Sequence, residues 1–278
     1  MNAPTLEAPP PDFAPIVIKR ASPFSLRRSR VFLLPLAVAV VLLLSWHAAI
    51  RITGNELLPT PIESAYGIVE LFEKGLLAKY VVASIFRVTW GFSLAVLIGL
   101  PFGLVLGWFR PAYEAFNPFI QVLRPISPIA WIPLAILWFG VSDVAPIFLI
   151  FLASVFPIVT AATAAVQNMQ QVYLRAARNF GLTRWQLFRL VVFPAALPQI
   201  ITSLRIALGI AWLVVVAAEM VAVSSGLGFL IIEARNAGKR YDLVVAGMFL
   251  IGVTGLILDI LIRRLERFDE VRWGYGSR

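Results

Sequence analysis

The chain has 278 residues, of which 60% are hydrophobic, and its mean hydropathy is +0.86. A soluble domain is about 45–50% apolar, so this composition indicates a protein whose main solvent is lipid. The net charge of +9 fits the bias of basic residues toward cytoplasmic loops better than it fits nucleic-acid binding. With no cysteine and a single histidine, His47, the chain has no disulfides and no zinc or thiolate site of the usual kinds.

The first 30 residues include MNAPTLEAPPPDFAP, which is rich in proline and polar groups and cannot build a core. We predict a disordered cytoplasmic tail at 1–30. It is not a cleavable signal peptide, because the apolar run after it is long enough to cross a membrane.

Six segments have the roughly 20 mainly apolar residues that a membrane-spanning helix needs. They are 31–50, 83–109, 117–139, 145–166, 199–222 and 243–262. Basic clusters before the first segment and after the last place both termini in the cytoplasm. The clusters are Lys19, Arg20, Arg27, Arg28 and Arg30, and Arg263, Arg264, Arg267, Arg272 and Arg278. The sequence therefore predicts an all-α integral membrane protein with about six transmembrane helices.

These spans divide the chain into a first transmembrane helix at 31–50, an outer loop at 51–82, a core at 83–265 and a cytoplasmic tail at 266–278. Within the loop, residues 56–79 are too polar to span, and two prolines, Pro59 and Pro61, break the entry. A loosely amphipathic set predicts a helix lying on the outer surface. The set is Ile62, Tyr66, Val69 and Leu76.

Small residues recur every four positions along the second span, on one helical face. They are Gly91, Ala95, Gly99, Gly103 and Gly107. Such a face lets another helix backbone approach closely. The pattern favours tight packing inside one chain, and a contact between subunits is the alternative.

The third span, NPFIQVLRPISPIAWIPLAILWFG, is interrupted by four prolines. Each proline removes a backbone donor, and irregular backbone in a membrane is tolerated only inside protein or along a watery cavity. Broken helices of this kind often mark a translocation path, whereas a simple kink would only shape the bundle. Arg124, Ser127 and Trp131 are the candidates to line a path that favours anions, although a shallow Arg124 can also snorkel to the interface.

Glu219 lies near the outer end of the fifth span, and we group it with the path residues. A role in a gate and simple interfacial placement are both compatible with this position. Because Glu219 and Arg124 lie at different depths, we do not expect a direct ion pair between them.

The stretch RAARNFGLTRWQLFRLVVFPAALP, residues 175–198, has four arginines and no acid between two apolar spans. Gly181 suits the left-handed position that ends a helix, and Thr183 with Gln186 fits a capping box that begins the next one. The second helix is predicted to end near Phe193, before Pro194 and Pro198. This cytoplasmic helix–glycine–helix element is either a docking surface for a soluble partner or an interfacial helix on anionic lipid.

The same stretch resembles the cytoplasmic signature of permease subunits of ATP-binding-cassette importers. That signature is Glu-Ala-Ala, three residues, Gly, nine residues, a hydrophobic residue, one more, and Leu-Pro. Five residues of this chain match it in spacing, and Arg175 stands where the family usually has Glu. The matching residues are Ala176, Ala177, Gly181, Leu197 and Pro198.

Three further stretches resemble the nitrate, sulfonate, taurine and bicarbonate branch of that family. They are LLPTPIESA, RPISPIAWIPLAILWFG and SLRIALGIAWLVVVAAEMVAVSSGLGFLI. The resemblance implies a type I (MetI-like) permease bundle in a bacterial inner membrane, a small anionic substrate and two permease subunits, here a homodimer. It also implies cytoplasmic ATPases that bind ATP and Mg, and an extracytoplasmic solute-binding protein.

On this resemblance the coupling element at 170–194 contacts the ATPases. Its residues are Arg175, Ala176, Ala177, Arg178, Gly181, Thr183, Trp185, Gln186, Pro194, Leu197 and Pro198. Gly181→Asp is expected to abolish docking. The chain has no G-x-x-x-x-G-K-[ST] loop to hold phosphates, so we expect that it is not the ATPase and needs no cofactor of its own. The glycine-rich segment 224–228 follows a span on the outer side, and we interpret it as a turn and not as a phosphate-binding loop. The alternative function is an ion-coupled carrier or a channel that works without an ATPase.

Overall fold

A computed structural model describes residues 24–54 and 58–264, and within these ranges every regular element is helical. The chain divides into two units, one up to Ile52 and one from Thr53 onward. The predicted tails at 1–23 and 266–278 lie outside the described residues.

The first unit consists of helix α1 (Phe24–Thr53), whose segment Leu33–Thr53 is apolar enough to span a membrane. Its large apolar side chains from Leu33 to Leu44 are exposed. Residues 24–30, which we predicted to be part of a disordered tail, instead form the first turns of this helix. The segment FSLRRSR has no glycine or proline, so nothing in it prevents the helix from extending.

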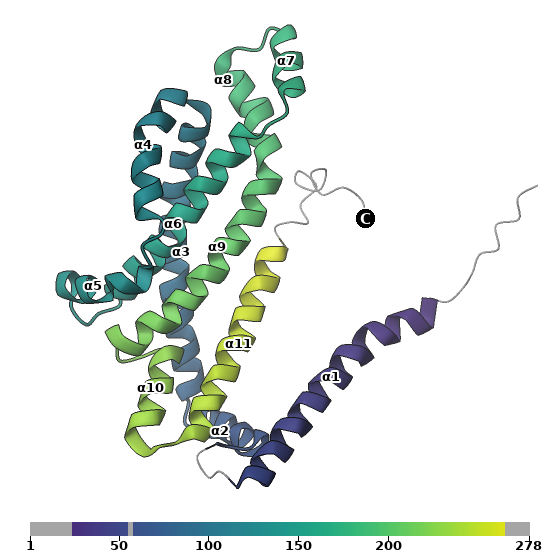
Figure 1. Ribbon diagram of the computed structural model, residues 1–278, viewed down its shortest axis with the longest axis vertical. Helices are drawn as coiled ribbons and strands as arrows, with labels where there is room; N and C mark the ends of the chain where they lie inside the picture. Colours follow the sequence, from purple (N-terminus) through teal and green to yellow (C-terminus); the bar gives the residue numbers. More distant parts are fainter. Residues whose placement is uncertain (1–23, 55–57, 265–278) are drawn as a thin grey trace, which may run out of the picture. The chain divides into compact units, whose positions relative to one another are not determined.

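The second unit is a helical bundle (Figure 1). Its elements in chain order are α2 (Pro61–Glu73), α3 (Leu76–Trp108), α4 (Arg110–Leu123), the 3₁₀ turn η1 (Pro128–Trp131), α5 (Ile132–Phe139), α6 (Val144–Gln167), α7 (Gln171–Asn179), α8 (Arg184–Leu187), the π-helical segment η2 (Phe188–Val192), α9 (Phe193–Ala222), α10 (Leu227–Gly238) and α11 (Tyr241–Arg263). The α7–α8 hairpin lies at one end of the bundle, and α2 and α10 lie at the other (Figure 1).

Five helical stretches in the described part of the chain are long and apolar enough to cross a membrane, and a bent pair would make six. The pair is α4 with η1 and α5, and its two halves meet at 81°. The predicted third span at 117–139 is therefore not one continuous helix. Pro125 and Pro128 explain the break, because proline disfavours a helical conformation in the residue before it and provides no backbone donor.

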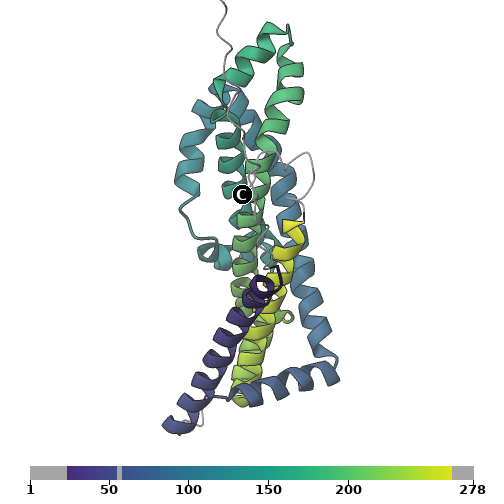
Figure 2. The same ribbon diagram turned by 90° about the vertical axis from the view of Figure 1, so that its right-hand side faces the viewer.

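Helix α2 runs across the end of the bundle in the predicted outer loop (Figure 2). Pro61 occupies its first turn, and Thr60 and Glu63 form a capping box. Its buried side includes Leu71, whereas Tyr66 and Phe72 are exposed. The predicted loop boundary at 82 is too late, because α3 begins at Leu76, directly after a left-handed glycine.

Helices α3 and α6 pack along their lengths, and the predicted small-residue face of α3 forms this contact. A methyl group on Gly103 would lie 2.6 Å from the carbonyl oxygen of Val159, and one on Gly91 would lie 2.7 Å from Ile150 Cβ. Gly99 and Gly107 meet α6 in the same way. The structure thus places the four glycines at a contact within the chain.

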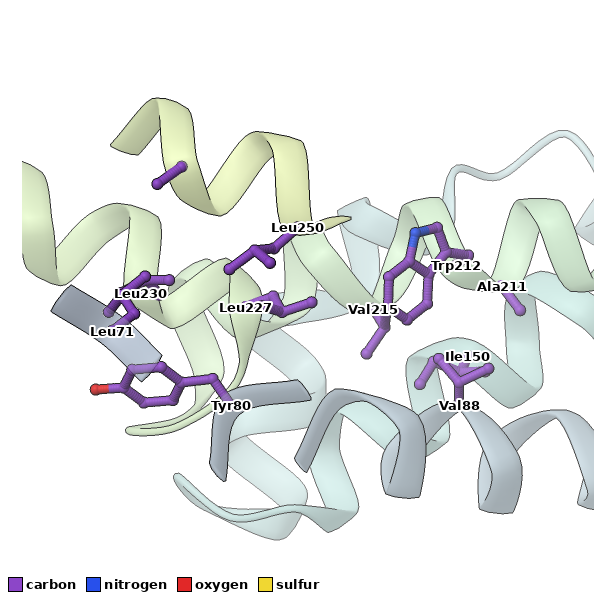
Figure 3. Packing of buried hydrophobic residues seen from close by; sticks show 11 residues of the cluster. Leu71, Tyr80, Val88, Ile150, Ala211, Trp212, Val215, Leu227, Leu230 and Leu250 are labelled. Carbon is purple, nitrogen blue, oxygen red and sulfur yellow. The ribbon is translucent and has the colours of Figure 1, made fainter. Parts of the chain in front are cut away.

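The main core joins α2, α3, α6, α9, α10 and α11 toward the α2–α10 end of the bundle. Figure 3 shows its side chains converging, with Trp212 between Val215 and Ala211 of its own helix. The indole Nε1–H of Trp212 donates to the carbonyl oxygen of Ile251 at 3.1 Å, which satisfies a polar group that would otherwise be costly to bury. This core holds the α2–α10 end together, where a buried charge cluster also lies.

Candidate functional site

The α7–α8 hairpin is closed by a tight glycine turn. The N–H of Gly181 donates to the carbonyl oxygen of Arg178 at 2.9 Å, and the N–H of Leu182 donates to that of Ala177 at 3.3 Å. This pair of bonds is a Schellman motif, and Gly181 has the left-handed φ of +73° that the motif requires. The predicted conformation of Gly181 is therefore confirmed, and no atom lies within 4 Å of where a side chain on it would start.

The second half of the hairpin begins as predicted but does not end as predicted. Thr183 Oγ1 accepts from the N–H of Gln186, and Gln186 Oε1 accepts from the N–H of Thr183, which completes the capping box. The expected stop at Phe193 is wrong, because α8 continues through the π-helical η2 into α9. Pro194 follows two residues after the π-helical η2, and a local π-helical adjustment of this kind can accommodate a proline in a membrane helix; Pro198 lies inside α9.

The helical continuity makes residues 184–222 one apolar stretch that carries the hairpin on its end. The hairpin side of this joint is packed, since Ala177, Leu187 and Val192 are buried in one cluster with α3 and α6. Trp108 of α3 contacts Phe188 edge-on, with ring centroids 5.6 Å apart. A displacement of the hairpin would therefore be transmitted directly to α9.

The outer surface of the hairpin is basic and aromatic. Four arginines are exposed, and none forms an ion pair with a carboxylate in the described part of the chain. They are Arg175, Arg178, Arg184 and Arg189. Phe180 is 86% exposed and Trp185 is 69% exposed. Large exposed aromatic side chains beside uncompensated cations are typical of a surface that a partner covers.

The other residues of the predicted coupling set are closer to the bundle. Ala176 is exposed on α7, Leu197 and Pro194 are half-buried, and Pro198 is buried. The hairpin residues of the signature thus share one exposed surface, whereas its Leu-Pro end lies within the first turns of α9.

The break in the third span gathers the predicted path residues Arg124, Ser127 and Trp131 around one corner. Arg124 is the C-cap of α4 and is exposed, and Ser127 precedes the first turn of η1. Trp131 is half-buried, and its indole Nε1 is buried without a hydrogen-bond partner in the described structure. These residues therefore put one cation and two donor-bearing side chains at the bend.

Glu219, which we grouped with the path, is completely buried and belongs to a charge cluster near the α2–α10 end. Arg87 Nη1 donates to Glu219 Oε1 at 2.7 Å, and Arg87 is itself 1% exposed. Ser84 Oγ and the N–H of Gly228 both donate to Glu219 Oε2, at 2.8 and 3.0 Å. As expected, Arg124 is not its partner.

The cluster also includes Asp143, which follows α5, and Ser225, which follows α9. Arg87 donates to Asp143 Oδ1 from Nε at 2.9 Å and from Nη2 at 2.6 Å. It donates to the carbonyl oxygen and to the Oγ of Ser225 as well. One guanidinium therefore joins four parts of the bundle.

Arg87 is the functional candidate that sequence reasoning missed. It lies eleven residues after the start of α3, about 16 Å at 1.5 Å per residue. A charge inside an apolar span is a signal of function by itself, and this one was present in the second span. Its partners could not be identified, because Glu219 is 132 residues away and Asp143 is 56 residues away.

Of the glycine-rich 224–228, which we predicted to be a turn, residues 224–226 form a bend, whereas Leu227 and Gly228 already begin α10. The segment fits closely over Glu219. Gly226 has a φ of +109°, and a methyl group on it would lie 2.3 Å from the carboxyl carbon of Glu219. A methyl group on Gly228 would lie 2.2 Å from the carbonyl oxygen of Val216. These glycines allow the α9–α10 connection to approach the buried carboxylate.

Comparisons with known proteins agree on the class. Residues 99–268 match the family of the binding-protein-dependent transport system inner membrane component. The taurine transport system permease protein TauC of Escherichia coli is 34% identical over 86% of this chain and 89% of its own length. The nitrate import permease protein NrtB of Synechocystis is 35% identical over 89% of this chain and 93% of its own length.

A solved structure of the MetNI methionine ABC transporter, described as inward facing, has the same fold. Its matching chain superposes with a TM-score of 0.60 at 21% identity, over 70% of this chain and 96% of that chain. The type I (MetI-like) fold expected from the signature is confirmed. This chain belongs to the binding-protein-dependent inner membrane permease family: it is the membrane-spanning permease subunit of an ABC importer and not itself an enzyme, since separate ATPase subunits hydrolyse the ATP.

Proposed function

We propose that this permease imports a small anionic solute and that its α7–α8 hairpin is the docking element for a cytoplasmic ATPase. The observation that carries the proposal is the capped, basic and aromatic hairpin built on the end of α9. ATP-driven closure of two ATPases would move two such hairpins. Because each hairpin is continuous with a spanning helix, the motion would rock the bundle between inward-open and outward-open forms.

The proposal sets the sidedness of the molecule. The hairpin end faces the cytoplasm of a bacterial cell, together with both termini, and the α2–α10 end faces outward. The basic clusters flanking the first and last spans support this orientation. A solute-binding protein would deliver its cargo at the α2–α10 end, and a homodimer of this chain would enclose the path.

The anionic substrate class is supported by two observations. The relatives named above are permeases for taurine and for nitrate. In this chain, the corner of the broken third span holds Arg124 without a carboxylate partner in the described residues, beside Ser127 and Trp131. We assign these three residues to the path.

Co-purification from mild detergent tests the docking assignment. The tagged wild-type chain is expected to retain a soluble protein that has a phosphate-binding loop, and Gly181→Asp is expected to release it. Gly181→Asn is the matched control, because asparagine tolerates a left-handed φ and adds no charge. If Gly181→Asp retains as much ATPase as Gly181→Asn, the hairpin is not the docking element.

The alternative is an ion-coupled carrier or a channel. It predicts that the chain purifies alone and transports in proteoliposomes without ATP.

Proteoliposomes also test the path: Arg124→Ala is expected to reduce ATP-driven uptake of nitrate or taurine, whichever the wild type transports. Unchanged uptake in Arg124→Ala would remove that residue from the path.

A further inference from the structure

The guanidinium of Arg87 has two edges with different partners. A guanidinium has five N–H donors, and the contacts described above account for all of them. Nη1 contacts Glu219 and the carbonyl oxygen of Ser225, whereas the Nε–Nη2 edge contacts Asp143 and the Oγ of Ser225. The two edges therefore hold two different carboxylates.

These carboxylates differ in how firmly they are held. The side chain of Glu219 is 0% exposed and has two further donors, Ser84 Oγ and the N–H of Gly228. The side chain of Asp143 is 58% exposed, and within the described structure its carboxylate contacts only Arg87. Water can solvate a released Asp143, so this contact contributes little stability, while Glu219 has no solvent to move to.

An open cavity of about 490 Å³ is lined by Arg87 together with Asp143 and Ser225, the two residues that contact its Nε–Nη2 edge. Its polar lining is Lys79, Arg87, Asp143 and Ser225, and its apolar wall comes from α3. Lys79 is exposed and has no ion-pair partner in the described part of the chain. Ser225 Oγ accepts from Arg87, which leaves its own hydroxyl proton free to donate.

When Asp143 turns away, this cavity presents donors: two N–H groups of Arg87, the ammonium of Lys79 and the hydroxyl of Ser225. The charges of Arg87 and Glu219 compensate each other, so Lys79 supplies the net positive charge that favours an incoming anion, while the Nε–Nη2 edge of Arg87 supplies the N–H donors. A guanidinium edge offers two parallel N–H groups, which suit an anion with two oxygens on one side. The chemistry matches a carboxylate, a nitrate, a sulfonate or a phosphate group.

We propose that the Nε–Nη2 edge of Arg87 is an exchangeable binding site for a small oxyanion, with Asp143 as its resident ligand. The site lies toward the α2–α10 end, where the importer would receive its solute. The inference rests on the proposed function only for that sidedness. Either a free oxyanion or the phosphate of a lipid headgroup can supply the chemistry.

The test uses the purified full chain in nanodiscs of phosphatidylcholine, without any ATPase or binding protein. Sodium nitrate or sodium methanesulfonate replaces sodium chloride at constant ionic strength, and the apparent Kd is taken from the rise in Tm. Asp143→Asn is expected to lower the Kd by about fivefold, because an exposed competing ion pair is removed. Lys79→Gln is expected to raise it severalfold, and Lys239→Gln, which removes a charge from the same end of the bundle, should not change it.

Two comparisons between variants would overturn the proposal. One is a Kd that is the same in Asp143→Asn and in the wild type, and the other is an equal effect of Lys79→Gln and Lys239→Gln. Absence of saturable binding of either anion, with no effect of anionic lipid, would also overturn it. Nanodiscs containing phosphatidylglycerol identify the source: if that lipid stabilises Asp143→Asn and competes with nitrate, the ligand is a headgroup phosphate, and otherwise it is the free oxyanion.

Because no ATPase is present, a negative binding result leaves the importer assignment intact. Conversely, failure to co-purify an ATPase leaves the oxyanion site intact. Asp143 and Lys79 are both exposed, so neither variant removes packing from the core.

Discussion

Removing the cation of the buried Arg87–Glu219 pair should destabilise the protein more than any surface change. In Arg87→Met, Glu219 would remain 0% exposed without a counter-ion, although Ser84 Oγ and the N–H of Gly228 would still donate to it. Breaking a buried pair in this way costs about 3–5 kcal/mol. The exposed contact with Asp143 adds little to this cost.

The companion variant Glu219→Gln keeps the volume of the side chain and leaves Asp143 as the counter-ion of Arg87. It should cost about 1–3 kcal/mol, the range for disrupting a buried hydrogen-bonded group. In the double variant Arg87→Met/Glu219→Gln neither the guanidinium nor the Glu219 carboxylate remains. Its loss of stability should therefore be smaller than the sum of the two single losses by up to about 3 kcal/mol. At about 2–4 °C per kcal/mol, Arg87→Met should lower Tm by roughly 10 °C.

The assay heats purified protein and measures the monodisperse fraction by size-exclusion chromatography. Arg110→Met is the matched control, because the Arg110–Glu114 pair is exposed and its loss should leave Tm unchanged. The reasoning is refuted if Arg87→Met has the same Tm as the wild type. It is also refuted if the two single effects add without coupling.

Three further perturbations test other parts of the bundle. Gly103→Ala should cost about 1–3 kcal/mol and lower Tm, because the new methyl group would lie 2.6 Å from the carbonyl oxygen of Val159. Because a π-helical turn holds about one residue more than an α-helical turn, deleting Leu190 from η2 should restore an α-helical register and leave the hairpin in nearly the same orientation relative to α9, so the folded chain should keep its ATPase in co-purification. Hydrogen bonds from Arg240 and Lys74 lower the pKa of Glu70 to about 2. The stability that this carboxylate gives to α2 should therefore be complete above pH 4.5 and be lost as pH falls toward 2.

Each of these has a control or a contradicting result. Gly252→Ala is helical and has open space at its Cβ position, so it should not lower Tm, and equal losses at Gly103 and Gly252 would contradict the close-packing account. A Leu190 deletion that releases the ATPase from a folded chain would show that the π-helical turn itself is needed to orient the hairpin. Hydrogen exchange of α2 measures the pH effect, and Glu70→Gln should remove its dependence between pH 4.5 and 2.

Local patterns were sufficient for the elements whose signals lie within a few residues. Gly181 and the Thr183–Gln186 pair identified both halves of the hairpin, because a left-handed glycine and a capping box act over four or five positions. The same logic failed at Pro194 and Pro198. A proline inside a helix that crosses a membrane can be accommodated by a local π-helical adjustment, and η2 ends two residues before Pro194, whereas Pro198 lies inside α9 without ending it.

The sequence by itself determined that this protein is an all-helical membrane permease, because apolar length and a short signature are properties of contiguous residues. Only the tertiary structure decided which residues share a site. Arg87, Asp143 and Glu219 come from three different stretches of the chain, and no local pattern predicts that they meet. Lipid offers no partner to a buried charge, so the bundle has to supply one from distant segments, and that pairing exists only once α3, α6 and α9 have packed.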